Sequence, residues 1–367
     1  MEYDDCILNM TEYISGCKFN QLLIQPSCVP LPLSDDVLKE IVPAAKDFAL
    51  LNGAGMRYRG RYNPEILEMA PFFLFPSPFP GRDFEFVKEL QPHINLLMHK
   101  IAHDYDFLHS CLKNTIQVDD FTARLWKIYE TVRKEGISQC ISLGVFRCDY
   151  FYCTLSRSVI LFVVEDVTYN ICDQRFHEYE IRNQRPEIHV IRRNLTQIGN
   201  TAKLTEDKRL IVDDMEIAVV YFRCGYEPNQ YPTETEWEAR LTIERSKAIK
   251  CPSIYYHLAG AKKVQQEMAA PGVLEKYLDP AVAKKVARLF TGLYSLDKGD
   301  SGDRAIEMAL TSPQNFVLKP QREGGGNNIY GEEIAEVLEK IRDSPEREAF
   351  ILMDRIRPPV QRNYLLS

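Results

Sequence analysis

The sequence predicts a mixed α/β protein, because its hydrophobic pattern changes twice along 367 residues. Roughly the first 150 residues carry apolar side chains at helical spacing. Over about the next hundred residues, short apolar strands alternate with helical segments, and helices and strands complete the chain. Such alternation is typical of sheets covered by helices, and the length favours two or three structural units.

The N-terminal part is predicted to be mainly helical. Ser34 is a capping candidate for a helix over residues 34–51, and a longer helix is predicted over residues 84–112. A third helix starts at Asp119 and stops at Gly136.

Residues 70–80, APFFLFPSPFP, separate the first two of these helices. Proline lacks the N–H that a helix interior needs, so this segment is not predicted to be helical. Its phenylalanines indicate an irregular segment packed on the core. A proline-rich ligand for another protein is the alternative interpretation.

The middle of the chain predicts a small α/β unit that closes near Leu258. Apolar strands are predicted in SVILFVVED from Ser158, in EIHVIR from Glu187 and in EIAVVYFR from Glu216. A hairpin is predicted around Asp213–Asp214.

The final third is predicted to contain helices and two strands. Asp279–Pro280 opens a helix whose apolar face runs as far as Leu293, because proline suits the first helical position. The strands are NFVLK and AFILMDRI, with a helix over residues 332–343 between them. From Arg357 onward no amphipathic pattern remains, so these residues are predicted to be frayed.

Composition excludes several classes of function. The net charge of −7 argues against nucleic-acid and anionic-membrane partners, which need clustered Lys and Arg. The longest apolar run, Val159 to Val164, is too short to cross a membrane, and the acidic N-terminus does not resemble a signal peptide. We therefore expect a cytoplasmic protein.

The chain also offers few candidate metal ligands. Ten cysteines lie between Cys6 and Cys251 without a CxxC pair, so a zinc ribbon is not predicted and free thiols are expected. His99 and His103 stand four residues apart on a predicted helix. They are either two metal ligands or part of a solvated helix face, and the second interpretation is favoured.

The most informative segment is FVLKPQREGGGNNIYGEE, over residues 316–333. A strand delivers Lys319, and three glycines, Gly324 to Gly326, let the backbone approach a ligand and aim N–H groups at phosphate oxygens. Glu323 offers a hard oxygen ligand for Mg²⁺. The segment is neither a Walker A loop nor a GxGxxG turn, and a hairpin tip at the surface remains the alternative.

This segment resembles the glycine-rich triphosphate loop of eukaryotic glutathione synthetases, which have an ATP-grasp fold. Further blocks resemble the same family in family order: VDDFTARLWKIYETVRKEGI, IHVIRR, EIAVVYFRCGY, CPSIYYHLAGAKKVQQEM, LFTGLYSLD and FILMDRI. The resemblance covers roughly residues 35–150 and 158–356. It implies an ATP-grasp-type core with a helical N-terminal part over 1–157, an inserted α/β substrate-binding domain over 158–258 and a further core part over 259–367.

The resemblance implies a ligase that joins γ-glutamylcysteine to glycine, with ATP and Mg²⁺ as cofactors and glutathione as product. The substrate carboxylate attacks the γ-phosphate of ATP and ADP leaves; the glycine amine then attacks the resulting acyl phosphate and displaces inorganic phosphate. Family members are homodimers. Cations and positioned donors are expected where negative charge develops, and Arg147, Lys262 and Lys319 resemble the catalytic residues.

The remaining site residues are also carried over from the family pattern. Nucleotide contacts are implied for Lys262, Lys319, Pro320, Gln321, Arg322, Glu323, Gly324, Gly325, Gly326, Asn327, Asn328, Tyr330, Met353, Asp354, Arg355 and Ile356. Dipeptide contacts are implied for Arg147, Asn170, Gln174, Arg223, Cys224, Gly225 and Tyr226. Glu323 is the implied Mg²⁺ ligand. Asp354 and Arg355 stand where a Glu-Lys pair is common, and Cys224 stands where Asp or Ala is usual.

Two stretches depart from the family pattern. After Asp149–Tyr150 the family continues with a segment that holds a Glu-x-Asn pair for Mg²⁺, whereas this chain has FYCTLSRS, residues 151–158. At Ser367 the family still has a substrate arginine and a lid. The alternative hypotheses are therefore a catalytically deficient paralogue or isoform that pairs with a full-length synthetase and modulates it, and a stand-alone ATPase.

Overall fold

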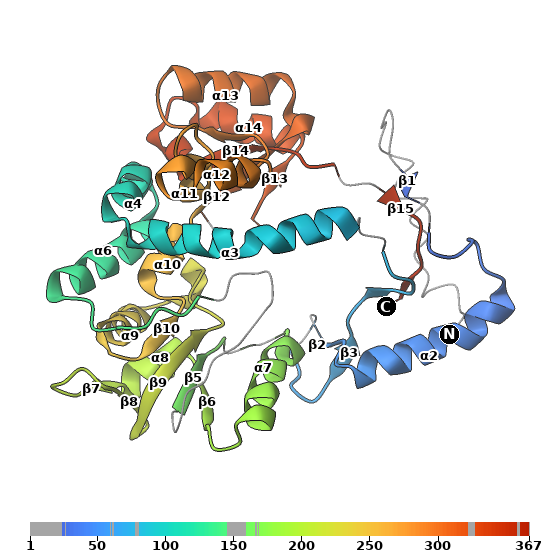
Figure 1. The fold of residues 1–367 in the computed structure, drawn as a ribbon, viewed down its shortest axis with the longest axis horizontal. Helices are drawn as coiled ribbons and strands as arrows, with labels where there is room; N and C mark the ends of the chain where they lie inside the picture. Colours follow the sequence, from blue (N-terminus) through green and yellow to red (C-terminus); the bar gives the residue numbers. More distant parts are fainter. Residues whose placement is uncertain are drawn as a thin grey trace. The chain divides into compact units, whose positions relative to one another are not determined.

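A computed structural model describes residues 24–25, 27–58, 60, 62–77, 81–144, 159–165, 167, 169–321, 327–357 and 360–366. The chain forms two compact units, each assembled from separate stretches (Figure 1). Unit 1 comprises Met1–Phe86, Asp166–Pro186 and Arg357–Ser367, and unit 2 comprises Val87–Glu165 and Glu187–Ile356. The three-part division at residues 157 and 258 stays a prediction.

Among its described residues, unit 1 combines two complete helices with short strand pairs. Its helices are α2 (Asp35–Leu51) and α7 (Ile171–Gln184), and α2 confirms the helix predicted over residues 34–51. The strands form three pairs: β2 (Gly55–Arg57) with β3 (Leu67–Met69), β4 (Phe72–Phe73) with β16 (Leu365–Leu366), and β1 (Ile24–Gln25) with β15 (Val360–Gln361).

The prediction that the chain is frayed from Arg357 onward is wrong. Strand β16 pairs with a segment nearly 300 residues earlier, β15 pairs with one more than 300 residues earlier, and Leu366 is buried. The Leu33 N–H donates to the Tyr364 hydroxyl at 2.9 Å, and the Asn363 side chain donates to the Phe75 carbonyl at 2.7 Å. Such long-range pairing leaves no local pattern in two-residue strands, which explains the error.

The larger sheet of unit 2 has six strands in the order β6-β5-β9-β8-β7, with β10 also paired to β9. Strand β5 runs parallel to β6 and β9, whereas β8 runs antiparallel to β9 and β7 runs antiparallel to β8. The strands are β5 (Val159–Val163), β6 (Val190–Arg193), β7 (Lys203–Leu204), β8 (Leu210–Val212), β9 (Met215–Phe222) and β10 (Ile249–Cys251).

The predicted hairpin in this sheet is confirmed. Asp213 and Asp214 join β8 to β9 with φ values of 48° and 61°. Positive φ at both central residues is the conformation that matches a tight turn to the twist of the two strands. Helices α8 (Leu195–Thr201) and α9 (Glu234–Arg245) pack against each other in the same unit.

The N-terminal helices of unit 2 are α3 (Gly81–His103), which begins in unit 1, α4 (Tyr105–Leu112), α5 (Thr115–Val118) and α6 (Asp120–Glu135). The single helix predicted over residues 84–112 is interrupted at Asp104, whose carboxylate accepts from the Phe107 N–H at 2.9 Å and caps α4. The helix predicted to start at Asp119 and stop at Gly136 is confirmed. The Asp119 carboxylate accepts from the Thr122 N–H and caps α6, and Gly136 follows the helix with a φ of 88°.

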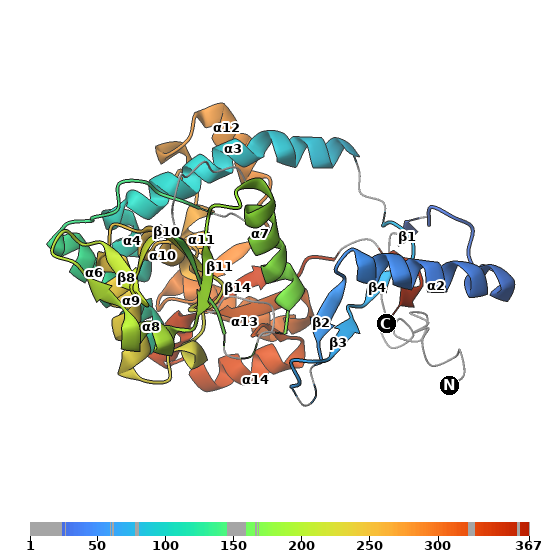
Figure 2. The ribbon, with the colours of Figure 1, turned by 90° about the horizontal axis from the view of Figure 1, so that it is seen from below.

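The second sheet of unit 2 has four antiparallel strands in the order β11-β14-β12-β13. They are β11 (Leu293–Ser295), β12 (Phe316–Pro320), β13 (Ile329–Tyr330) and β14 (Phe350–Asp354). Figure 2 shows α13 (Asp300–Thr311) and α14 (Glu332–Ile341) beside this sheet. Their apolar faces and the strands share one buried cluster: Leu296, Ala305, Ile306, Ala309, Phe316, Leu318, Ile334, Leu338, Ile341 and Leu352.

One predicted helix in this region is too long. Helix α12 (Pro280–Ala287) begins after Asp279 as expected, but Leu293 belongs to β11, where it pairs with Met353 of β14. Pairing with a distant strand overrides the helical spacing of Leu289 and Leu293. Among the described residues, no helix combines the length and apolar character that crossing a membrane requires.

Candidate active site

The candidate site is built around β12, a central strand of the four-stranded sheet. Its first three residues are buried, and Lys319 and Pro320 at its end are half-buried. Gln321 follows and is buried. Arg322, Glu323 and the glycines at 324–326 lie outside the described residues. The chain is described again at Asn327, and the Asn328 side chain donates to the Tyr330 hydroxyl at 3.1 Å on β13. The hairpin β12–β13 therefore carries the glycine-rich segment.

Helix α11 (Lys262–Met268) brings a second lysine to this hairpin. The backbone N–H of Lys263 donates to the Gln321 side-chain oxygen at 3.0 Å. This hydrogen bond joins the first turn of α11 to the residue that precedes the glycine-rich segment. Because the contact is buried, it fixes where Lys262 stands relative to the end of β12.

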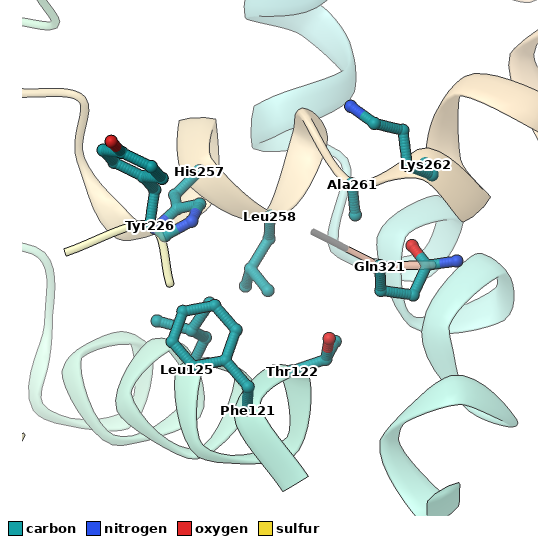
Figure 3. Close-up of a pocket in the computed structure, with 9 residues that line it drawn as sticks. All are labelled: Phe121, Thr122, Leu125, Tyr226, His257, Leu258, Ala261, Lys262 and Gln321. Atoms are coloured by element: carbon teal, nitrogen blue, oxygen red, sulfur yellow. The ribbon is translucent and has the colours of Figure 1, made fainter. Parts of the chain in front are cut away.

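A small cavity connects these nucleotide candidates to the dipeptide candidates. Its volume is about 30 Å³, which is room for about one water molecule. Figure 3 shows Tyr226 and His257 at one end and Lys262 and Gln321 at the other, with Leu258 between them. Phe121, Thr122, Leu125 and Ala261 complete the lining. The structure thus brings Tyr226, Lys262 and Gln321 together, three residues that the sequence singled out.

The two adjacent lysines of α11 have different environments. Lys262 is half-buried and lines the cavity, whereas Lys263 is 2% exposed. The Lys263 ammonium donates to Ser295 Oγ at 2.7 Å, Asp297 Oδ2 at 2.8 Å and Gln266 Oε1 at 2.9 Å. All three of its protons have an acceptor, so Lys263 anchors α11 to the end of β11.

The strand expected to contact adenine is β14 and the residues after it. The Asp354 carboxylate accepts from the Tyr294 hydroxyl and the Gly292 N–H, both at 3.1 Å. Burial, followed by the Asp354 carboxylate, raises the pKa of Tyr294. The backbone N–H of Asp354 donates to Gly292, and that of Arg355 donates to Asn315. These groups tie the end of β14 to its neighbours, while the Ile356 side chain is exposed and Met353 is half-buried.

The dipeptide candidates Arg223, Cys224, Gly225 and Tyr226 form the turn that follows β9. The N–H groups of Arg223 and Cys224 both donate to the Val163 carbonyl at the end of β5, at 2.9 and 3.3 Å. Cys224 and Gly225 are buried, and Tyr226 is half-buried. Burial, followed by nearby carboxylates, raises the pKa of Tyr226, so its hydroxyl remains a hydrogen-bond donor at neutral pH.

Asn170 and Gln174 belong to unit 1, at the start of α7, and not to unit 2. Gln174 is fully buried, and its amide donates to the Asn170 oxygen at 3.3 Å. The structure brings these two residues together. Arg147, the third dipeptide candidate, lies outside the described residues.

The cavity also contains His257, which sequence reasoning did not single out. Burial, followed by the Arg240 charge, lowers the pKa of His257 to about 3, so the imidazole is neutral at physiological pH. The only sequence feature that could have identified His257 as a site residue is its position in the family-like block CPSIYYHLAG. A lone histidine on an apolar helix is, however, more often a core residue.

The described residues hold no group of three or more His, Cys, Asp or Glu side chains arranged to bind a metal ion. His99 Nδ1 lies 2.6 Å from the Tyr256 hydroxyl, and the rings of His99 and His103 are 4.3 Å apart. This pair therefore contacts an aromatic side chain within unit 2. Glu323, the predicted Mg²⁺ ligand, lies outside the described residues.

Comparisons with known proteins agree with this arrangement. The family model of the ATP-binding domain of eukaryotic glutathione synthase matches residues 35–367. The chain is 39% identical to the glutathione synthetase of Xenopus laevis and 40% identical to that of Homo sapiens. Each alignment has 401 positions and covers 90% of this chain and 84% of the relative. Because 401 positions exceed the 367 residues present here, the relatives carry residues without a counterpart in this chain.

A solved structure shows the same fold. A glutathione synthetase-like effector from Globodera pallida matches with a TM-score of 0.67 at 19% identity, and the match covers 93% of this chain and 86% of the other. The predicted α/β fold class is therefore confirmed. From the matched residues and the identity to its relatives, the chain belongs to the eukaryotic glutathione synthase family of ATP-dependent ligases.

Proposed function

We propose that this chain joins γ-glutamylcysteine to glycine with ATP and releases glutathione. The observation that carries the proposal is the cavity that Tyr226, Lys262 and Gln321 line together. The cysteinyl carboxylate of γ-glutamylcysteine, bound near Tyr226, would face the residues that would hold the γ-phosphate, as an acyl-phosphate reaction requires. Family membership supports the same reaction.

Lys262 and Lys319 are the proposed phosphate ligands. Both are half-buried, so a bound phosphate would be partly withdrawn from water and attracted more strongly to their charges. The proposed cover is the segment over residues 320–328, including Arg322 and the three glycines. Mg²⁺ is proposed at Glu323, where it would neutralise charge on the phosphate oxygens.

Adenine is proposed to lie against Met353, Asp354, Arg355 and Ile356. The N–H groups of Asp354 and Arg355 already donate within the protein. The backbone of Ile356 and the apolar side chain of Met353 are therefore the groups proposed to meet the ring. The proposed contact with adenine would therefore depend little on which side chains stand at positions 354 and 355.

The proposed dipeptide site contains Arg147, Arg223 and Tyr226, together with Asn170 and Gln174. An arginine suits this role because its planar guanidinium binds a carboxylate with two parallel hydrogen bonds. The neutral hydroxyl of Tyr226 suits a donor to the amide or carboxylate of γ-glutamylcysteine.

A homodimer in the cytoplasm is the proposed state of the protein. The C-terminal end of helix α2 exposes the large apolar side chains of Phe48, Leu50 and Leu51, with exposed fractions of 69%, 50% and 87%. Such a patch on one helix end is favourable for contact with a second copy. The described cysteines Cys28, Cys111, Cys140 and Cys172 are free thiols, as a reducing compartment favours.

A second candidate function is modulation of a longer synthetase without catalysis. It is favoured by the residues that the relatives carry and this chain does not, because Mg²⁺ needs several oxygen ligands. The test is ADP and glutathione release by the purified chain with Mg·ATP, with each substrate omitted in turn.

Release that requires both γ-glutamylcysteine and glycine supports the ligase. Lys262→Met is then expected to abolish it, whereas Lys276→Met, an exposed lysine outside the site, is expected to leave it unchanged. Release without either substrate indicates a stand-alone ATPase. No release from the chain alone, with a changed rate of a full-length synthetase on mixing, indicates the modulator.

A further inference from the structure

The turn that carries Arg223 and Tyr226 wraps three backbone N–H groups around one side-chain oxygen. Gln230 Oε1 accepts from the N–H of Gly225, from that of Tyr226 at 2.9 Å and from that of Glu227 at 3.3 Å. Gln230 is the last residue of the short helix η2 (Pro228–Gln230). Its N–H donates in turn to the Glu227 carbonyl at 3.1 Å, which fixes this helix to the turn.

The opposite side of the same turn is held by Tyr231. The Tyr231 hydroxyl donates to the Gly225 carbonyl at 2.9 Å, and its ring stacks on Trp237 with 4.0 Å between the centroids. Arg240 donates to the same hydroxyl at 3.5 Å and is paired with Glu244 at 3.0 Å, both almost fully buried. Tyr231 is thus itself locked in place.

Gly225 makes this close arrangement feasible. Its φ is 95°, which glycine adopts without strain. A Cβ at this position would lie 2.8 Å from the Tyr231 hydroxyl oxygen. The peptide of Gly225 therefore lies between two side chains, one that accepts from its N–H and one that donates to its carbonyl.

Converging backbone N–H groups form an electropositive concavity, which in many loops binds an anion. Here an amide oxygen of the protein fills it before any substrate arrives. The first residue of the turn is fixed separately, because Arg223 donates to the Val163 carbonyl. Without the Gln230 oxygen, three N–H groups would lose their acceptor, and the end of the turn that bears Tyr226 would no longer be held.

We propose that Gln230 is a positioning residue, which sets Arg223 and Tyr226 for γ-glutamylcysteine through the backbone of their turn. This inference rests on the proposed dipeptide role of those two residues. Gln230 acts through its side-chain oxygen on Gly225, Tyr226 and Glu227, and it does not line the cavity next to Lys262.

The test compares Gln230→Met, which keeps the length of the side chain but removes the acceptor, with Gln230→Glu, which keeps the acceptor. Calorimetry at pH 7.5 measures the Kd of each variant for γ-glutamylcysteine and for Mg·ATP. We expect Q230M to weaken dipeptide binding at least tenfold while Mg·ATP binding changes less than twofold. Q230E is expected to remain within threefold of the wild type for both ligands.

Hydrogen exchange measured on a peptide that contains residues 225–227 tests the turn independently of ligands. These amides are expected to exchange at least tenfold faster in Q230M than in the wild type or Q230E. Where Q230M does not fold, Tyr231→Phe replaces it, because it removes the donor to the Gly225 carbonyl and keeps the ring on Trp237. A dipeptide affinity weakened at least threefold is then expected.

The outcomes separate the inference from the proposed function. A wild type that binds no γ-glutamylcysteine refutes the dipeptide site itself, and the exchange rates then still decide whether Gln230 holds the turn. A wild type that binds, with Q230M or Y231F binding equally well, overturns the positioning role alone. Equal losses for dipeptide and Mg·ATP also overturn it, because they indicate a general structural defect.

Discussion

Replacing Lys263 by methionine tests whether the buried ammonium anchors α11. The side chain is 2% exposed and donates to three acceptors, Ser295, Asp297 and Gln266. Methionine fills a similar volume but offers no proton. The carboxylate of Asp297 then loses a partner 2.8 Å away, and that of Glu267 loses one 3.2 Å away.

The expected cost follows from the burial of these partners. Removing one member of a fully buried ion pair costs about 3–5 kcal/mol, because the other charge is left without compensation. The side chains of Asp297 and Glu267 are 30% and 33% exposed, so water hydrates them in part once the ammonium is gone. We therefore expect a loss of about 2–3 kcal/mol, which includes the hydrogen bonds to the two neutral acceptors.

Urea denaturation followed by tryptophan fluorescence measures this loss where it occurs. Trp126 and Trp237 are the two tryptophans of the chain, and both are buried in unit 2 together with Lys263. The control is Lys284→Met on the exposed side of α12, expected to change the free energy of unfolding by less than about 0.5 kcal/mol. A K263M variant as stable as this control would refute the anchoring argument.

Three further predictions follow from single residues. Gly325→Val is expected to abolish Mg·ATP binding in calorimetry, since the added side chain blocks the approach of the backbone to phosphate; unchanged binding would contradict the role of the glycines. Folding lowers the pKa of His257 from 6.5 to about 3. Between these two pH values the unfolded chain binds more protons at this residue than the folded chain, so the free energy of unfolding falls as the pH falls from 6.5 towards 3. In His257→Gln the free energy of unfolding should fall less steeply with falling pH, by about 1 kcal/mol per pH unit. Parallel pH profiles of the two proteins would refute this contribution of His257. Gly225→Ala should cost roughly 1–3 kcal/mol more in denaturation than Gly272→Ala, because both have positive φ but only Gly225 meets a side chain, Tyr231; equal costs would contradict the close approach.

Local features of the fold were predictable from the sequence. A capping aspartate and a terminal glycine define α6, and two adjacent aspartates define the turn between β8 and β9. In each case the residues that determine the conformation lie within a few positions of it. Family resemblance added the ATP-grasp core, which periodicity alone does not indicate.

Features that depend on distant partners were not predictable. Leu293 continues a helical pattern but pairs with Met353, sixty residues later. Leu365 and Leu366 have no pattern of their own and pair with Phe73 and Phe72. These contacts exist only once the chain has folded, so a short sequence window carries no sign of them.

The candidate site shows the same limit. Resemblance assigned roles to Lys262 and Gln321, and the structure places both on one cavity. The local pattern alone could not distinguish Lys262 from its neighbour Lys263, since both are lysines on one short helix; the resemblance selected Lys262. It also gave no reason to select Gln230, whose importance depends on which backbone groups meet its oxygen.

The pairing of β1 with β15 and of β4 with β16 has a consequence for the order of events during synthesis on the ribosome. All strands of both unit 2 sheets lie between Val159 and Asp354, so they are synthesised before residues 360–366. The N-terminal strands must wait for partners made hundreds of residues later. A released chain that ends at Asp354 should therefore protect unit 2 from protease while the segment around Phe72 is still cleaved.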